Sequence, residues 1–98
     1  MGDDIPGVGP LKEARLTILN QDGFHARPCS VFVHMASRFK SEIWVRRDDV
    51  EVNAKSLLGV MMLAAETGAE LIVRAEGPDE AEAIEALTKL AEEKFGTE

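Results

Sequence analysis

The chain has 98 residues with 11 basic and 18 acidic side chains, which gives a net charge of −7. This length suits a single domain with one thin hydrophobic core. The acidic balance argues against a general nucleic-acid binder, which needs surplus cations to meet phosphates. The single cysteine excludes an internal disulfide framework and suits a reducing compartment. No apolar run approaches the roughly 18 residues of a membrane span, so we expect a small cytoplasmic domain without membrane insertion.

The N-terminal half shows one strand pattern followed by one helix pattern. Residues 1–10 contain three glycines and two prolines, and we expect them to form a flexible extension to a single domain at 11–98. Residues 13–19 alternate apolar with polar side chains, which predicts a strand that the Asn-Gln-Asp-Gly segment at 20–23 ends. Apolar side chains then recur every three or four residues from Pro28 to Phe39, which predicts an amphipathic helix that begins just after His25.

The C-terminal half predicts three further strands and two helices. Residues 41–46 alternate again, and residues 50–52 follow a short polar break, which indicates two strands joined by a turn. Ser56 is a favoured N-cap for an apolar helix that we expect to end at Gly68. Residues 70–75 predict a strand, and Asp79 with Glu82 resembles a capping box that starts a last helix.

The predicted order is therefore strand, helix, strand, strand, helix, strand, helix. A short chain with this order favours an α+β fold, because the helices must bury their apolar faces against the sheet. We expect an antiparallel sheet covered on one face by helices.

The two histidines have different settings. His34 lies in the middle of the first predicted helix, opposite its apolar stripe, and we expect it to be a solvated surface residue. His25 precedes that helix, where unpaired N–H groups and the helix dipole would stabilise an anion on its ring. Arg27 adds a guanidinium suited to phosphate oxygens. A neutral imidazole is a nucleophile, so His25 is either a phosphoryl acceptor or a loop histidine that only caps the helix. We expect no metal site, because no residue has ligand spacing to His25.

Two segments carry a family resemblance. Residues 23–28, Gly-Phe-His-Ala-Arg-Pro, resemble the active-site motif of the HPr family, the histidine-containing phosphocarriers of the bacterial phosphotransferase system. Residues 53–61, Asn-Ala-Lys-Ser-Leu-Leu-Gly-Val-Met, resemble the second signature of that family. The resemblance runs in order from about Lys12 to Phe95 and implies an open-faced β-sandwich with a four-stranded antiparallel sheet and three helices (βαββαβα).

The resemblance implies a role for each matching residue. His25 matches the histidine that accepts a phosphoryl group on Nδ1 from phosphorylated enzyme I and passes it to an EIIA-type sugar-transport component. Arg27 matches the arginine that contacts this group, and Ser56 matches the serine that an ATP-dependent HPr kinase/phosphorylase modifies in many bacteria. The resemblance implies a carrier without a cofactor, not an autonomous enzyme, and a monomer suits a shuttle.

The side chains that the resemblance implies for partner docking share a position beside this histidine: Phe24, Leu57, Leu58 and Met61. The second predicted helix is more apolar than a helix that lies over a sheet needs to be, which favours exposure of part of it.

Three positions depart from the family pattern. Cys29 stands where a small residue is common, and a buried hydrophobe explains it better than a redox role. Asp22 stands where the family often has Asn or Thr. Trp44 alternates away from its apolar neighbours, and we expect it on the open face of the sheet.

An alternative function remains open. Residues 61–65 and 93–96 resemble the nitrogen-related branch of the family, whereas the Lys55–Ser56 pair resembles the sugar branch. In the alternative, the chain is a regulatory binding module in which phosphorylated Ser56 and the helix that follows it engage a transcriptional regulator or a metabolic enzyme.

Overall fold

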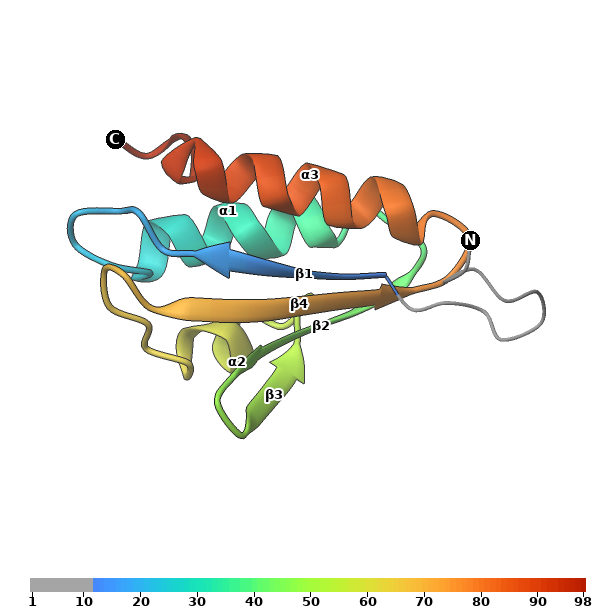
Figure 1. Cartoon of the computed structure of the whole chain (residues 1–98), viewed down its shortest axis with the longest axis horizontal. Helices are drawn as coiled ribbons and strands as arrows, with labels where there is room; N and C mark the ends of the chain where they lie inside the picture. The colour runs from blue at the N-terminus through green and yellow to red at the C-terminus, as the bar shows by residue number, and fades with distance from the viewer. Residues whose placement is uncertain (1–11) are drawn as a thin grey trace.

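The computed structural model describes residues 12–98 (Figure 1), so the extension expected at 1–10 lies outside the described residues. The elements alternate as the sequence predicts. They are β1 (Lys12–Thr17), α1 (Ala26–Ala36), β2 (Glu42–Arg47), β3 (Val50–Asn53), α2 (Leu57–Met61), β4 (Glu70–Glu76), α3 (Glu80–Glu92) and the 3-10 turn η1 (Lys94–Gly96). None of the helices within residues 12–98 combines the length and apolar character needed to cross a membrane.

The four strands form one antiparallel sheet in the order β1-β4-β2-β3. Leu16 pairs with Leu71 across β1 and β4, and Val45 pairs with Val73 across β2 and β4. Because side chains alternate along a strand, these buried residues share one face of the sheet. Helices α1 and α3 lie over that face (Figure 1), and α2 packs against α1 and β3 at its end. The predicted open-faced β-sandwich is confirmed.

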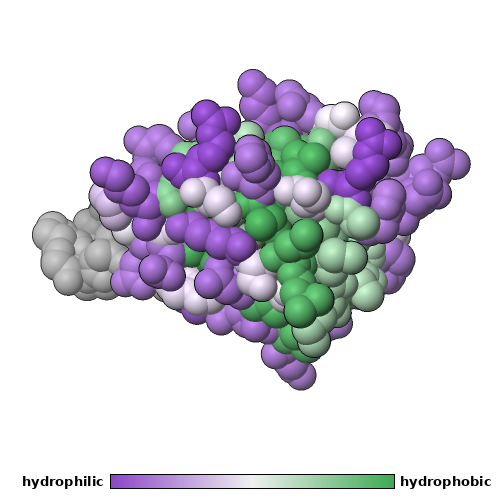
Figure 2. Space-filling view, turned by 180° about the vertical axis from the view of Figure 1, so that it is seen from behind, coloured by the Kyte–Doolittle hydropathy of each residue, from purple (hydrophilic) through white to green (hydrophobic). Residues whose placement is uncertain are grey.

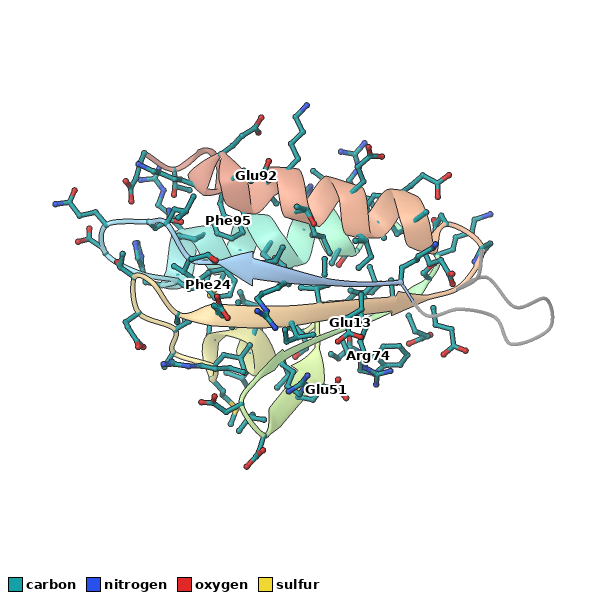
Figure 3. The ribbon with its side chains drawn as sticks, viewed as in Figure 1. Glu13, Phe24, Glu51, Arg74, Glu92 and Phe95 are labelled. Atoms are coloured by element: carbon teal, nitrogen blue, oxygen red, sulfur yellow. The ribbon has the colours of Figure 1, made fainter. Side chains whose placement is uncertain are left out.

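An aromatic trio closes the core at the end of the molecule where β1 leads into α1. The rings of Phe24, Phe32 and Phe95 have centroids 5.2 to 6.3 Å apart, with two of the three pairs near edge-to-face. Figure 3 shows Phe24 and Phe95 near each other although they come from opposite halves of the chain. Aromatic pairs in this geometry add to the stabilisation that burial provides. The trio therefore joins the C-terminal turn η1 to the loop before α1.

Helix α2 is shorter than the sequence predicts. The expectation that it runs to Gly68 is wrong, because the helix ends at Met61 and Ala64 adopts a left-handed backbone with φ 47°. The Arg47 guanidinium donates to the carbonyl oxygens of Leu63 and Ala64 at 3.1 and 2.8 Å. These carbonyl oxygens therefore accept from a side chain and not from a helical N–H. The Gly68 N–H does not close a helix either, because it donates to the Ile18 carbonyl oxygen at 2.8 Å.

The expected capping box at the start of α3 is also wrong, because the Asp79 side chain makes no cap bond to its own helix. Its carboxylate accepts instead from the Ser41 hydroxyl at 2.5 Å and from the backbone N–H groups of Lys40 and Ser41, both at 2.9 Å. The start of α3 is therefore tied to the loop before β2. These donors, the Ser41 hydroxyl first, lower the pKa of Asp79 from 3.8 to about 2.

We expect Asp79→Asn to lower the thermal midpoint at neutral pH, because an amide NH₂ would face an N–H donor in place of one carboxylate oxygen. A carboxyl group whose folded pKa is depressed stabilises the fold above its unfolded pKa, and that stabilisation disappears as the pH falls through the folded pKa. The native chain should therefore lose this contribution between pH about 4 and about 2, whereas the variant should not.

Circular dichroism melts of both chains from pH 2 to pH 7 measure this difference. Glu82→Gln, at an exposed position in the first turn of α3, is the matched control and should leave the melting curve unchanged. Superimposable midpoints for the native chain and Asp79→Asn at every pH would contradict the assignment.

Candidate functional site

His25 is the N-cap residue of α1, as the sequence predicts. Its backbone is extended (φ −101°, ψ −162°), its carbonyl oxygen accepts from the Cys29 N–H at 2.9 Å, and its side chain is exposed. No side chain caps the helix, and no hydrogen bond within residues 12–98 uses the N–H of Ala26 or Arg27. Because Pro28 has no N–H, these two groups are the open donors of the helix start. An exposed imidazole thus lies beside unpaired donors.

The loop that carries His25 packs against the segment that follows α2. The Phe24 N–H donates to the Ala65 carbonyl at 2.8 Å, and the Gly23 N–H closes a turn on Asn20 at 3.0 Å. Gly23 has φ +80°, and a Cβ on it would lie 2.9 Å from the same Ala65 oxygen. Only glycine meets both the left-handed backbone and the close approach. The position of the His25 backbone is therefore set by its neighbours on both sides.

Beneath this loop the structure corrects one expected docking residue. Phe24 was expected beside the histidine as part of a docking surface, but its side chain is only 3% exposed and packs on Phe32 and Phe95. Its ring anchors the loop and leaves almost no surface for a partner. Cys29 is fully buried and its thiol donates to the Phe24 carbonyl at 3.3 Å. Burial raises the pKa of the Cys29 thiol to about 11, which fits the predicted buried hydrophobe.

A shallow hollow of about 390 Å³ opens beside His25. Met61 of α2 lines it on one side, and Asp22 and Glu66 contribute carboxylates. The Arg47 guanidinium pairs with Glu66 at 2.6 Å, the same group that holds the carbonyls after α2. Sequence reasoning missed Arg47, because nothing in a local pattern shows that β2 reaches this segment. The hollow thus lies between His25 and α2, and one of its two carboxylates, that of Glu66, is neutralised by Arg47.

Helix α2 presents an apolar surface next to this hollow. We define the α2 patch by its four exposed large side chains, whose exposed fractions are given in parentheses: Leu57 (42%), Leu58 (74%), Met61 (41%) and Met62 (71%). Figure 2 shows hydrophobic surface gathered on this side of the molecule. The predicted exposure of Leu57, Leu58 and Met61 is confirmed. Sequence reasoning missed Met62, although the spacing 57, 58, 61, 62 marks one face of a helix.

Ser56 caps the start of α2, as its residue type predicts. Its hydroxyl oxygen accepts from the Gly59 N–H at 3.2 Å, and the residue is exposed. Lys55 beside it donates from Nζ to the Phe39 carbonyl at 2.8 Å, which ties the start of α2 to the turn after α1. The hydroxyl therefore lies in solvent at the border of the α2 patch.

The segments that build this surface contain no acidic residue. Residues 23–41 and 52–65 hold four of the 11 basic side chains and none of the 18 acidic ones, although the chain carries a net charge of −7. Arg27 makes no ion pair with any residue in the part of the chain that the structure describes. The surface that these two segments form is thus basic and apolar, and the acidic side chains beside it are Asp22 and Glu66 of the hollow.

Comparison with known proteins identifies the family. Residues 12–93 match the family model described as the PTS HPr component phosphorylation site. The chain belongs to the HPr family. It is 49% identical to phosphocarrier protein HPr of Treponema pallidum (strain Nichols) over 81 residues, which cover 83% of this chain and 92% of that protein.

Two further HPr relatives agree with this assignment. The crystal structure of HPr-C-His from Thermoanaerobacter tengcongensis matches with a TM-score of 0.84 and 50% identity, over 89% of this chain and 98% of that one. The HPr-like protein Crh of Bacillus subtilis (strain 168) is 39% identical over 84 residues, which cover 86% of this chain and 99% of that protein. HPr proteins are phosphocarriers of the phosphotransferase system, and the fold described above is theirs.

The remaining singled-out residues of this HPr-family chain lie away from the hollow. His34 is exposed, as predicted. Trp44 lies on the open face of the sheet, with the Arg74 guanidinium 4.4 Å from its ring, and Arg74 pairs with Glu51 at 2.9 Å (Figure 3). Within residues 12–98, no three His, Cys, Asp or Glu side chains gather closely enough to hold a metal ion.

We expect Gly23→Ala to destabilise this HPr-family chain more than Gly68→Ala does. Both glycines have positive φ, +80° and +90°, but a Cβ on Gly68 meets nothing within 4 Å. Gly68→Ala should therefore lose about 1 kcal/mol from the backbone alone, and Gly23→Ala about 2 kcal/mol or more, because the Ala65 carbonyl must also move. Urea unfolding of both variants measures the difference. Equal losses would show that the close approach contributes nothing.

Proposed function

We propose that this chain is a phosphoryl carrier in which His25 accepts a phosphoryl group from phosphorylated enzyme I and passes it to an EIIA-type sugar-transport component. The observation that carries the proposal is the exposed His25 ring beside the unpaired N–H groups of Ala26 and Arg27. A phosphoryl group on the ring brings negative charge and three acceptor oxygens, which these donors and the Arg27 guanidinium can meet.

The two transfer steps need few groups on this chain beyond the His25 ring and these donors. In the first transfer a ring nitrogen of His25 attacks phosphorus, and the new N–P bond forms as the bond to the donor breaks. In the second transfer the same N–P bond breaks as the acceptor takes the group. The hollow beside His25 is shallow, so the partners must supply the rest of each active site. The chain acts in this scheme as a carrier and not as an autonomous enzyme.

The surface around His25 indicates what its partners present. The α2 patch lies next to the hollow through Met61, and the segments 23–41 and 52–65 contain basic but no acidic residues. A complementary partner therefore has an apolar centre with acidic residues around it. We infer that enzyme I and the EIIA-type component dock in turn on this one surface.

We also propose that residues 11–98 act as one domain, as a monomer in the cytoplasm, with residues 1–10 as an extension to it. One continuous core, to which all three helices contribute buried side chains, supports the single domain. A monomer leaves the α2 patch free for successive partners.

We expect His25→Ala to abolish phosphoryl acceptance. The full chain, incubated with phosphoenolpyruvate and enzyme I, should gain the mass of one phosphoryl group and lose it after brief acid treatment, as a phosphoramidate does. His34→Ala, the matched control at the other histidine, should be labelled like the native chain. Labelling that persists in His25→Ala, or a native chain that takes no label, would contradict the proposal.

Regulation through Ser56 is a second candidate function. The Ser56 hydroxyl is exposed at the border of the α2 patch, where a kinase can reach it. A phosphate there would add about two negative charges to the segment 52–65, which holds no acidic residue, and would repel an acidic or phosphorylated partner. The similarity to Crh of Bacillus subtilis, which is described as a catabolite repression HPr, supports this candidate. An ATP-dependent HPr kinase/phosphorylase would be the modifying enzyme, and a transcriptional regulator the partner of the modified form.

We expect Ser56→Asp to slow phosphoryl acceptance at His25 relative to Ser56→Asn. Both side chains can cap α2, so the pair differs in charge and not in the cap. The initial rate with limiting enzyme I should fall about twofold or more in Ser56→Asp, because the added charge weakens docking. Equal rates for the two variants would remove the basis for control by charge at this position.

A further inference from the structure

We propose that Asp22 tunes the phosphoryl-transfer potential of His25, because its carboxylate destabilises the phosphorylated ring and so makes it a stronger donor. This inference rests on the proposed function of His25. Asp22 lines the same hollow as His25 and Ala26, and it makes no ion pair with any residue between 12 and 98. Glu66, the other carboxylate of the hollow, is paired with Arg47 at 2.6 Å. Asp22 is therefore the uncompensated negative charge at the site.

The backbone around Asp22 is held in place. The Gly23 N–H bonds to the Asn20 carbonyl at 3.0 Å, which closes a turn that contains Asp22. The Thr67 hydroxyl donates to the carbonyls of Asn20 and Gln21, and the Gln21 N–H donates to the Glu98 carboxylate at 2.6 Å. The loop cannot carry Asp22 away from the hollow without breaking these bonds.

The sign of the effect follows from the charges. Before transfer the Asp22 carboxylate lies near the positive end of α1 and a neutral or cationic ring, an arrangement that is favourable or neutral. After transfer the ring carries a phosphoryl group whose negative charge shares the hollow with Asp22. Repulsion then raises the free energy of the phosphorylated form alone. Because the residues are exposed, solvent and salt screen the repulsion, so the effect is a few-fold and not many powers of ten.

The repulsion from Asp22 changes the equilibrium of phosphoryl exchange between phosphoenolpyruvate and His25. With enzyme I as catalyst, the phosphorus–oxygen bond of phosphoenolpyruvate breaks and an N–P bond forms on His25. The imidazole loses its ring proton to solvent, and the released enolate takes up a proton on carbon to become pyruvate. Repulsion from Asp22 shifts this balance toward phosphoenolpyruvate and, equally, favours transfer onward to any acceptor. A purely structural role of Asp22 would change folding stability and leave this equilibrium in place.

The test measures the phosphorylated fraction by intact mass over a range of phosphoenolpyruvate-to-pyruvate ratios, with catalytic enzyme I and the full chain. We expect Asp22→Asn to be half phosphorylated at a ratio about two- to fivefold lower than the native chain. Added salt should reduce the difference between the ratios of the native chain and Asp22→Asn. Asp22→Glu keeps the charge and should stay close to the native ratio. Asp49→Asn makes an equal charge change at an exposed turn between β2 and β3. This control should be half phosphorylated at the native ratio.

The outcomes separate the two proposals. An Asp22→Asn ratio equal to the native one, or a shift that Asp49→Asn reproduces, would overturn the role of Asp22 and leave His25 as the acceptor. A native chain and variants that never become phosphorylated would overturn the proposed function itself.

Discussion

The contact between the loop before α1 and the segment after α2 is the constraint on which the site depends. The Phe24 N–H reaches the Ala65 carbonyl at 2.8 Å, and the approach is possible because Gly23 has no side chain. The Phe24 ring is buried, and the next side chain, that of His25, is exposed. A carrier needs a nucleophile that partners can reach on a backbone that does not move. Burial of one residue and exposure of its neighbour provide both.

The same loop is also held by the C-terminal end of the chain. The buried Asn20 side chain donates to the Lys94 carbonyl and to the Thr97 hydroxyl, both at 3.0 Å. Phe95 reaches the aromatic trio from a left-handed backbone with φ 58°, a conformation that bulky residues seldom adopt. Its burial in the trio offsets that strain, so the segment is held in this conformation by packing. The position of His25 thus depends on residues about 70 positions away in the sequence.

The parts of this structure that sequence could predict are those that local periodicity and residue type determine. The strands, the start of α1 at His25 and the Ser56 cap depend on neighbours within a few positions. The errors arise where hydrogen bonds cross long separations. Helix α2 ends early because Arg47 donates to the carbonyls of Leu63 and Ala64, which lie 16 and 17 positions after it in the sequence. The Asp79 carboxylate does not cap its own helix because it accepts from Ser41, 38 positions before it.

Phe24 shows a different limit of sequence reasoning. Its place next to the candidate histidine suggested a shared surface, but the Phe24 side chain is buried in the core, whereas the His25 side chain is exposed. The clustering of charge shows the converse. The acid-free segments 23–41 and 52–65 are visible in the sequence, yet only the packing of α1 against α2 makes them one surface.

The two modifications proposed for this chain would both lie on that shared surface. A phosphoryl group on His25 or on Ser56 would add negative charge to the segments 23–41 and 52–65, which hold no acidic side chain. Each modification would therefore weaken attraction to an acidic partner and strengthen attraction to a basic one. The phosphorylated and unphosphorylated forms would then present different charges on the same surface. One docking surface would distinguish donors from acceptors in this way, because the transferred group is itself part of what the partner recognises.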